Sequence, residues 1–157
     1  MKRWLGRGAV LVFLAAIVMA QTEAGRPTKS SENDRFVGAW RLAALEEPDA
    51  NGNIHKADCA GLLVFTQDGH MSVQVMYRNW QTQGQAGPVQ YAQGGYEASF
   101  GRYGINDART FTFHVEGAMV RTLIGKDLPR VYEFSGNQLI VRSTDPTEHW
   151  RVTWERY

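Results

Sequence analysis

The chain has 157 residues, of which 43% are hydrophobic and 21% charged, and its formal net charge is +1. This length suits one domain with a buried core rather than two. No run of basic residues occurs beyond the first 20 positions, which argues against a nucleic-acid partner. The single cysteine, Cys59, excludes an internal disulfide and a metal site built from several cysteines. With no cofactor motif in the sequence either, we expect no nucleic-acid partner, no metal and no other cofactor.

Residues 1–20 have the pattern of a secretory signal peptide. Basic residues come first, and an unbroken apolar run follows from Ala9 to Ala20. As a helix this run would span only about 18 Å, less than the hydrocarbon core of a bilayer. We expect cleavage after Ala20, export to the periplasm or the extracellular space, and no stable membrane insertion afterwards. An uncleaved leader that acts as a membrane anchor is the alternative.

A polar segment and then the first strand follow the leader. Residues 21–34 lack apolar periodicity and are rich in Gly, Pro, Ser and Asn, which predicts a flexible linker. The folded domain is therefore expected over residues 35–157. Residues 35–45 alternate as a strand does, and Gly38 inside this run argues against a helix.

The most regular alternation predicts a β-hairpin over residues 61–77. An apolar run is followed by Asp68-Gly69, a typical hairpin turn. The apolar residues of the second strand then share one face: Met71, Val73, Val75 and Tyr77. Residues 78–95 are rich in Gln and Gly and predict a long loop, with a short helix near Pro88–Gln93.

The second half of the domain continues as short strands separated by turn signals. The predicted strands are 97–105, 109–117, 130–134, 138–143 and 148–156, with a weaker one at 120–124. The whole domain thus has eight or nine short strands and no alternation of strands with helices. This pattern predicts an all-β fold, an antiparallel up-and-down barrel.

Several segments, in a fixed order, carry a resemblance to a known family. They are F-V-G-A-W-R-L (36–42), G-L-L-V-F-T-Q-D-G-H-M-S-V (61–73), F-G-R-Y-G-I (100–105), F-H-V-E-G (113–117), Y-E-F-S-G-N-Q-L (132–139) and V-T-W-E-R (152–156). Together they resemble the bacterial and fungal lipocalin-like domain family. The resemblance implies a lipocalin-like, calycin-type barrel with a central cavity, and it implies no single shared activity.

The same resemblance implies a structural role for the Gly-x-Trp strand. In lipocalin barrels this strand closes one end, and an arginine of the last strand packs over the indole. Gly38 and Trp40 would form the strand part of this closure here. Arg151 or Arg156 would supply the guanidinium group through a cation–π contact.

His114 and Glu116 are the candidate catalytic residues. Side chains at positions i and i+2 of a strand share a face, so these two can interact. If that face lines the barrel, burial would raise the pKa of Glu116 and make it a general base, with His114 as its partner. If it faces solvent, opposite Phe111, Phe113 and Val115, both are ordinary surface residues.

Aromatic side chains on several strands are candidates for the lining of a ligand cavity. With His114, the candidate ligand-binding residues are Tyr77, Tyr96, Phe100, Tyr103, His114, Tyr132 and Trp150. The leading hypothesis is an exported barrel that binds a small hydrophobic or amphipathic molecule in its interior. One alternative is a cofactor-independent isomerase, cyclase or hydrolase that uses His114 and Glu116. The other is a non-catalytic interaction domain whose core is filled by side chains.

Overall fold

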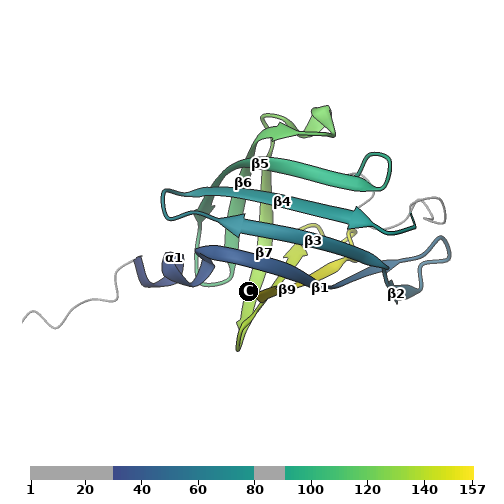
Figure 1. The fold of residues 1–157 in the computed structure, drawn as a ribbon, viewed down its shortest axis with the longest axis horizontal. Helices are drawn as coiled ribbons and strands as arrows, with labels where there is room; N and C mark the ends of the chain where they lie inside the picture. Colours follow the sequence, from purple (N-terminus) through teal and green to yellow (C-terminus); the bar gives the residue numbers. More distant parts are fainter. Residues whose placement is uncertain (1–29, 80–90) are drawn as a thin grey trace, which may run out of the picture.

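The structure of the protein, a computed structural model, describes residues 30–79 and 91–157 (Figure 1). Its elements, in chain order, are α1 (Ser30–Phe36), β1 (Gly38–Pro48), β2 (Ile54–Lys56), β3 (Cys59–Phe65), β4 (His70–Tyr77), β5 (Tyr96–Ile105), β6 (Thr110–Ala118), η3 (Arg121–Leu123), β7 (Asp127–Ser135), β8 (Gln138–Ser143) and β9 (Arg151–Arg156). The predicted signal peptide, most of the predicted linker and most of the loop predicted over 78–95 lie outside the described residues. Within residues 30–79 and 91–157, no helix has the length and apolar character needed to cross a membrane.

The strands form one antiparallel sheet that closes on itself. From β3 to β9 each strand pairs with the next, β1 pairs with β3, and β9 returns to pair with β1. This last pairing sets Trp40 opposite Arg156 and Leu45 opposite Val152. β2 adds only to the last residues of β1. The fold is therefore a closed barrel of eight strands with one extra strand, which confirms the predicted up-and-down barrel.

Side-chain alternation decides what fills the barrel. On β6, Phe111, Phe113 and Val115 are buried, and the residues between them face outward. β4 buries Met71 and Val75 in the same way. On these two strands the period of two in the sequence is enough to identify the inner face.

A bulge changes the alternation on β1. The register between β1 and β9 shifts between Leu42 and Ala44. An extra residue in one strand moves the following side chains to the other face. Trp40 is therefore buried before the bulge, and Leu45 and Glu47 are buried after it. In this way the carboxyl group of Glu47 comes to lie inside the barrel.

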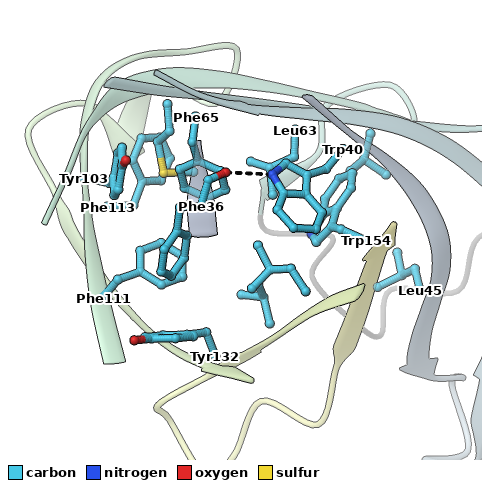
Figure 2. Close-up of a cluster of buried hydrophobic side chains, with 14 of the residues drawn as sticks. Phe36, Trp40, Leu45, Leu63, Phe65, Tyr103, Phe111, Phe113, Tyr132 and Trp154 are labelled. Atoms are coloured by element: carbon cyan, nitrogen blue, oxygen red, sulfur yellow. Dashed lines mark hydrogen bonds between the residues drawn. The ribbon is translucent and has the colours of Figure 1, made fainter. Parts of the chain in front are cut away.

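Helix α1 lies at one end of the barrel, here called the α1 end (Figure 1). Phe36, its last residue, is completely buried. Five aromatic rings surround the Phe36 ring at centroid distances of 4.8 to 5.9 Å: Phe65, Tyr103, Phe111, Tyr132 and Phe134. The indole Nε1 of Trp40 donates a hydrogen bond of 2.8 Å to the carbonyl oxygen of Phe36 (Figure 2). The helix is thus part of the hydrophobic core.

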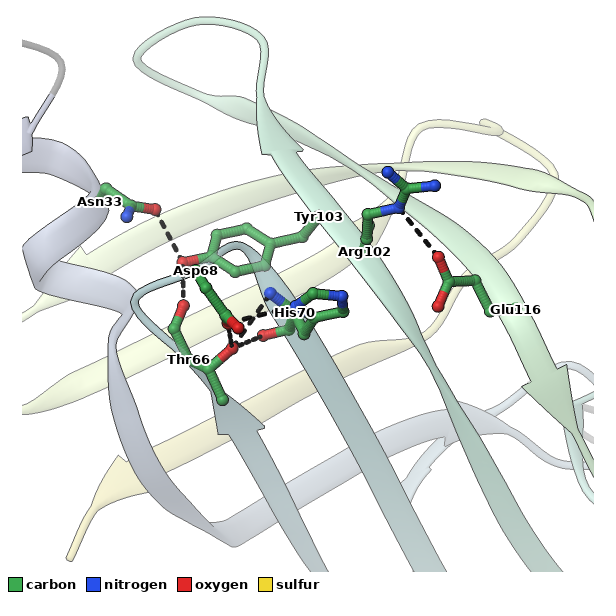
Figure 3. Close-up of polar contacts among 7 residues, drawn as sticks. All are labelled: Asn33, Thr66, Asp68, His70, Arg102, Tyr103 and Glu116. Carbon is green, nitrogen blue, oxygen red and sulfur yellow. Dashed lines mark hydrogen bonds and ion pairs between the residues drawn. The ribbon is translucent and has the colours of Figure 1, made fainter.

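This helix corrects the predicted linker at residues 30–34. A helix of seven residues is marginal by itself, so contacts with the barrel must hold it. One such contact is the hydroxyl of Tyr103 on β5, which donates a 2.7 Å hydrogen bond to Oδ1 of Asn33 (Figure 3). The linker prediction is therefore wrong for 30–34, because tertiary contacts form this helix without any apolar periodicity in its sequence.

Arg156 closes the seam between the first and last strands. Its guanidinium carbon lies 4.3 Å from the centroid of the Trp40 ring. Its Nη1 and Nη2 donate hydrogen bonds of 2.8 and 2.6 Å to the carbonyl oxygens of Val37 and Arg35. Gly38 has a φ of +134°, and a Cβ there would lie 2.7 Å from Nη1 of Arg156. Glycine is therefore needed at 38 both for the backbone conformation and for the space it leaves.

Arg151, the other arginine considered for this contact, lies elsewhere. Its Nη1 is 3.1 Å from Oε2 of Glu46, and both side chains are partly exposed on the outside of the barrel. Alternation along β9 explains the difference, because Arg156 follows the buried Trp154 by two residues and shares its inner face.

Candidate functional site

The barrel contains a mainly apolar cavity of about 90 Å³ on the far side of the aromatic core from α1. Apolar side chains of β3, β4, β6, β8 and β9 form most of its wall, among them Leu63, Val75, Phe113, Val141 and Trp154. The cavity extends toward the end of the barrel where β4 ends and β5 begins, because Tyr77 and Glu97 line it. Strand β2 lies at this end, here called the β2 end (Figure 1). There β1, β4, β6 and β8 end, and β3, β5, β7 and β9 begin.

Two charged side chains, Glu97 and Arg130, belong to the cavity wall among the described residues. Glu97 is the second residue of β5, and Arg130 lies on the inner face of β7, two residues before the buried Tyr132. None of the ion pairs within the described residues joins them. They nevertheless influence each other, because the charge of Arg130 lowers the pKa of Glu97. The two charges thus share one cavity without a direct salt bridge.

Burial dominates the behaviour of Glu97. Removal of its carboxyl group from water raises its pKa to about 7, against the opposing effects of Arg130 and a hydrogen bond with Ser99. Ser99 is itself buried and is the next inward-facing residue of β5. Glu97 can therefore exchange a proton near neutral pH.

Arg130 is held between two aromatic rings. Its guanidinium carbon lies 5.2 Å from the ring centroid of Tyr91 and 5.3 Å from that of Trp150. Its Nη1 donates a 2.9 Å hydrogen bond to the carbonyl oxygen of Pro129. Glu148 accepts hydrogen bonds from Trp150 Nε1 at 3.0 Å and from Tyr91 at 3.4 Å. These contacts fix the guanidinium group at the β2 end of the cavity.

A second buried carboxyl group, that of Glu47, lies at the same end. The hydroxyl of Tyr77 donates a 2.9 Å hydrogen bond to its Oε2. Burial raises the pKa of Glu47, although the bond from Tyr77 acts in the opposite direction. Burial and the nearby charges of Glu47 and Asp58 also raise the pKa of Cys59 to about 11. The Cys59 thiol is therefore protonated at neutral pH, which makes it a poor nucleophile.

Sequence reasoning missed Glu97 because the first half of β5 reverses the usual pattern, and it missed Arg130 because nothing local distinguishes this residue of β7 from the exposed arginines. The inner face of the first half of β5 carries Glu97, Ser99 and Gly101, whereas Tyr96 and Phe100 point outward. The pairing of β5 with β6 shifts between Phe100 and Gly101, where β6 contains the extra residue, Glu116, and a Cβ at 101 would overlap the backbone of β6. A polar inner face on one strand of an apolar barrel was the signal that could have identified the site.

The residues predicted to bind a ligand fall into three groups. Tyr77 and Trp150 line the cavity. Tyr103 and Tyr132 are buried around Phe36 at the α1 end, away from the cavity.

The remaining three correct the prediction, because they lie on outer strand faces. Phe100 is 57% exposed. The hydroxyl of Tyr96 bonds to the exposed side chain of Gln74. His114 lies between the inward-facing Phe113 and Val115. Their strand positions give the reason, since the inner positions of these strands belong to the alternate residues.

The candidate catalytic residues also lie on the outside of the barrel. The side chain of His114 is 45% exposed, and its Nδ1 is 2.7 Å from Oδ1 of Asp127. Glu116 contacts Arg102 instead, at 2.9 Å (Figure 3). The premise of a buried general base at Glu116 is therefore wrong. Among the described residues, no group of three or more His, Cys, Asp or Glu side chains is placed to hold a metal ion.

The chain matches the model of one protein family and is similar to several solved structures. Residues 37–157 match the model of a family described as lipocalin-like domain. Similar solved structures include a lipocalin-like protein from Bacteroides uniformis (16% identity, TM-score 0.47, 78% of this chain and 99% of that chain). Another is a lipoprotein, YedD, from Klebsiella pneumoniae (14% identity, TM-score 0.40, 77% and 70%). A third is a redesigned β-barrel (12% identity, TM-score 0.44, 80% and 94%). A search of curated proteins finds no match.

Proposed function

Since this chain belongs to the lipocalin-like domain family, we propose that it binds a small hydrophobic or amphipathic molecule inside its barrel. The cavity of about 90 Å³ carries the proposal. Its wall is mostly apolar, and its charged groups gather at one end, a pattern typical of small-molecule sites. Because ligand pockets usually begin at roughly 300 Å³, the ligand is short or inserts only its apolar part.

Binding of 1-hexanol, a short amphipathic molecule, tests this proposal. Trp150 and Trp154 line the cavity, so a ligand there should change the tryptophan fluorescence in a saturable way. Val73→Phe places a larger side chain in the cavity wall and should weaken binding at least tenfold. Val64→Phe is the matched control, because Val64 is the outward-facing neighbour of Leu63 on β3.

Two results would contradict the proposal. One is the absence of saturable binding by the wild-type protein with its circular dichroism spectrum intact. The other is equal weakening by the two substitutions at Val73 and Val64. The first would favour the alternative of an interaction domain whose interior is simply packed with side chains.

We also propose that the protein acts after export, in the periplasm or the extracellular space. The basic residues followed by the apolar run from Ala9 to Ala20 support this. N-terminal sequencing of the protein recovered from cells that produce the full chain should find Gln21 as the first residue. An intact N-terminus in the cytosolic fraction would overturn the proposal of export.

A further inference from the structure

The strongest unassigned feature is the pair of charged side chains in the apolar cavity. Glu97 on β5 and Arg130 on β7 both line this cavity and are not joined by an ion pair. A charge inside an apolar site is costly unless it has a partner. Two opposite charges that share a cavity without touching leave room for a group that bonds to both.

The chemistry of the two side chains defines that group. The guanidinium of Arg130 can only donate hydrogen bonds, so the ligand must offer an oxygen acceptor. The carboxylate of Glu97 can only accept, so a proton must lie between it and the ligand. A carboxyl group meets both conditions, because one oxygen accepts from Arg130 and the other shares a proton with Glu97. The planar guanidinium also matches a carboxylate well.

We propose that the barrel binds a short-chain monocarboxylate, with its aliphatic tail in the cavity and its carboxyl group between Arg130 and Glu97. This inference rests on the proposed function and names the chemical class of the ligand. The bound state holds one proton for two carboxyl groups. A ligand carboxylate therefore enters either with a proton from solution or beside a Glu97 that is already protonated.

The cavity volume limits the tail. A cavity needs about 15 Å³ of such space to hold one water-sized group, so about 90 Å³ has room for roughly six. A chain of about four to six carbons, with its head at the β2 end, fits this space. Hexanoate is therefore a suitable probe, with 1-hexanol and hexylamine as partners of equal tail length.

The other ionisable groups around the site make Glu97 the proton acceptor. Arg130 stays charged at any physiological pH. Burial raises the pKa of Tyr77 and Tyr91, so both stay neutral. Glu148 accepts hydrogen bonds from Trp150 and Tyr91 and is not among the residues that line the cavity.

Glu47, which also lies at the β2 end, is bonded to Tyr77 and is not part of the cavity wall. Glu97, whose pKa is about 7, is the carboxyl group of the wall. Uptake of one proton on binding is therefore expected above pH 7.

Titration calorimetry of the full chain with the three probes, between pH 6 and pH 9, tests the proposal. Hexanoate is ionised throughout this range, as any simple carboxylate is. Its affinity should be nearly constant below pH 7 and fall about tenfold per pH unit above it. Repeating the titration in buffers of different ionisation enthalpy should show that close to one proton is taken up for each hexanoate bound at pH 8.5. The affinity for 1-hexanol should change less than threefold over the same range.

Substitutions at the two charged residues separate their roles. Glu97→Gln should abolish the pH dependence of hexanoate binding. Arg130→Gln should weaken hexanoate binding at pH 6 at least tenfold and change 1-hexanol binding less than threefold. Glu133→Gln and Arg142→Gln are the matched controls, because these residues form an exposed pair, 3.5 Å apart, on the outside of β7 and β8. The controls should behave as the wild-type protein.

The outcomes distinguish this inference from the proposed function. If 1-hexanol binds and hexanoate does not, the inferred monocarboxylate ligand is wrong, and the proposal that the barrel binds a small molecule still holds. If hexylamine binds more tightly than hexanoate, with an affinity that rises with pH, the assignment of the ligand as a carboxylate is also wrong. If the folded protein binds none of the three probes, the inference and the proposed function both fail.

Discussion

Replacement of Phe36 by alanine tests whether α1 belongs to the folded core. Phe36 is 0% exposed, so the substitution removes a whole buried ring. Loss of the transfer free energy of such a ring costs about 1.5–3 kcal/mol. The surrounding rings belong to strands fixed by the barrel pairing, which limits collapse into the space left behind. The cavity term therefore raises the expected loss of unfolding free energy to about 3–5 kcal/mol.

Urea unfolding, followed by tryptophan fluorescence and circular dichroism, measures this loss. Domains of this size have unfolding free energies of about 5–15 kcal/mol, so the effect is a large fraction of the total. Phe100→Ala is the matched control, because Phe100 is 57% exposed on the outer face of β5. It should cost about 1 kcal/mol or less.

A loss below about 1 kcal/mol for Phe36→Ala, or a loss equal to that of Phe100→Ala, would refute the packing of α1 into the barrel. The slope of the unfolding transition adds a second criterion. If the substitution releases α1 from the native state, less surface is left to expose on unfolding, and the m-value should fall. An unchanged m-value with a large loss means that α1 stays docked over a cavity.

Three further predictions concern the barrel seam and the cavity. Arg156→Gln should lower the free energy of unfolding in urea by about 1–3 kcal/mol, because it removes the cation–π contact and two hydrogen bonds. Arg151→Gln should lower it by less than about 1 kcal/mol. Equal losses would contradict the role of Arg156 in joining the first and last strands. Gly38→Ala should cost at least about 1–2 kcal/mol because its φ is +134°, whereas Gly104→Ala, with no atom within 4 Å of the added Cβ, should be nearly neutral. The pKa of Glu97 is about 7 in the folded protein, against a usual 4.5. Between these two pH values the folded state therefore binds more protons than the unfolded state. As the pH rises from 4.5 to 7, the free energy of unfolding should fall by up to about 3 kcal/mol. Glu97→Gln should remove that part of the pH dependence, and identical pH profiles of the variant and the wild-type protein would disprove the raised pKa.

Much of the architecture could be predicted from local patterns. The period of two on β4 and β6 identified the inward residues correctly, because a half-buried strand separates apolar from polar side chains. The Asp68-Gly69 turn correctly predicted the position of the hairpin formed by β3 and β4. The predicted closed barrel required the first and last strands to meet, and Trp40 does lie opposite Arg156.

The candidate site could not be predicted in this way. On β5 the apolar Tyr96 and Phe100 point outward, and the polar Glu97 and Ser99 point inward, so the rule that assigns apolar side chains to the core selects the wrong face. Arg130 follows Pro129 in a strand of mixed character, and nothing local distinguishes it from the exposed arginines.

The sequence by itself thus determined the antiparallel barrel and the family, although it predicted a weak strand at 120–124, where the structure has η3, and did not predict β2. These follow from periodicity, turn residues and segment order, which act over a few neighbouring residues. Only the tertiary structure decided that α1 closes one end around Phe36, that Arg156 rather than Arg151 covers Trp40, and that Glu97 and Arg130 share the cavity. The reason is that register shifts at bulges and contacts between distant strands determine which side chains meet, and neither is encoded in the local pattern of any one strand.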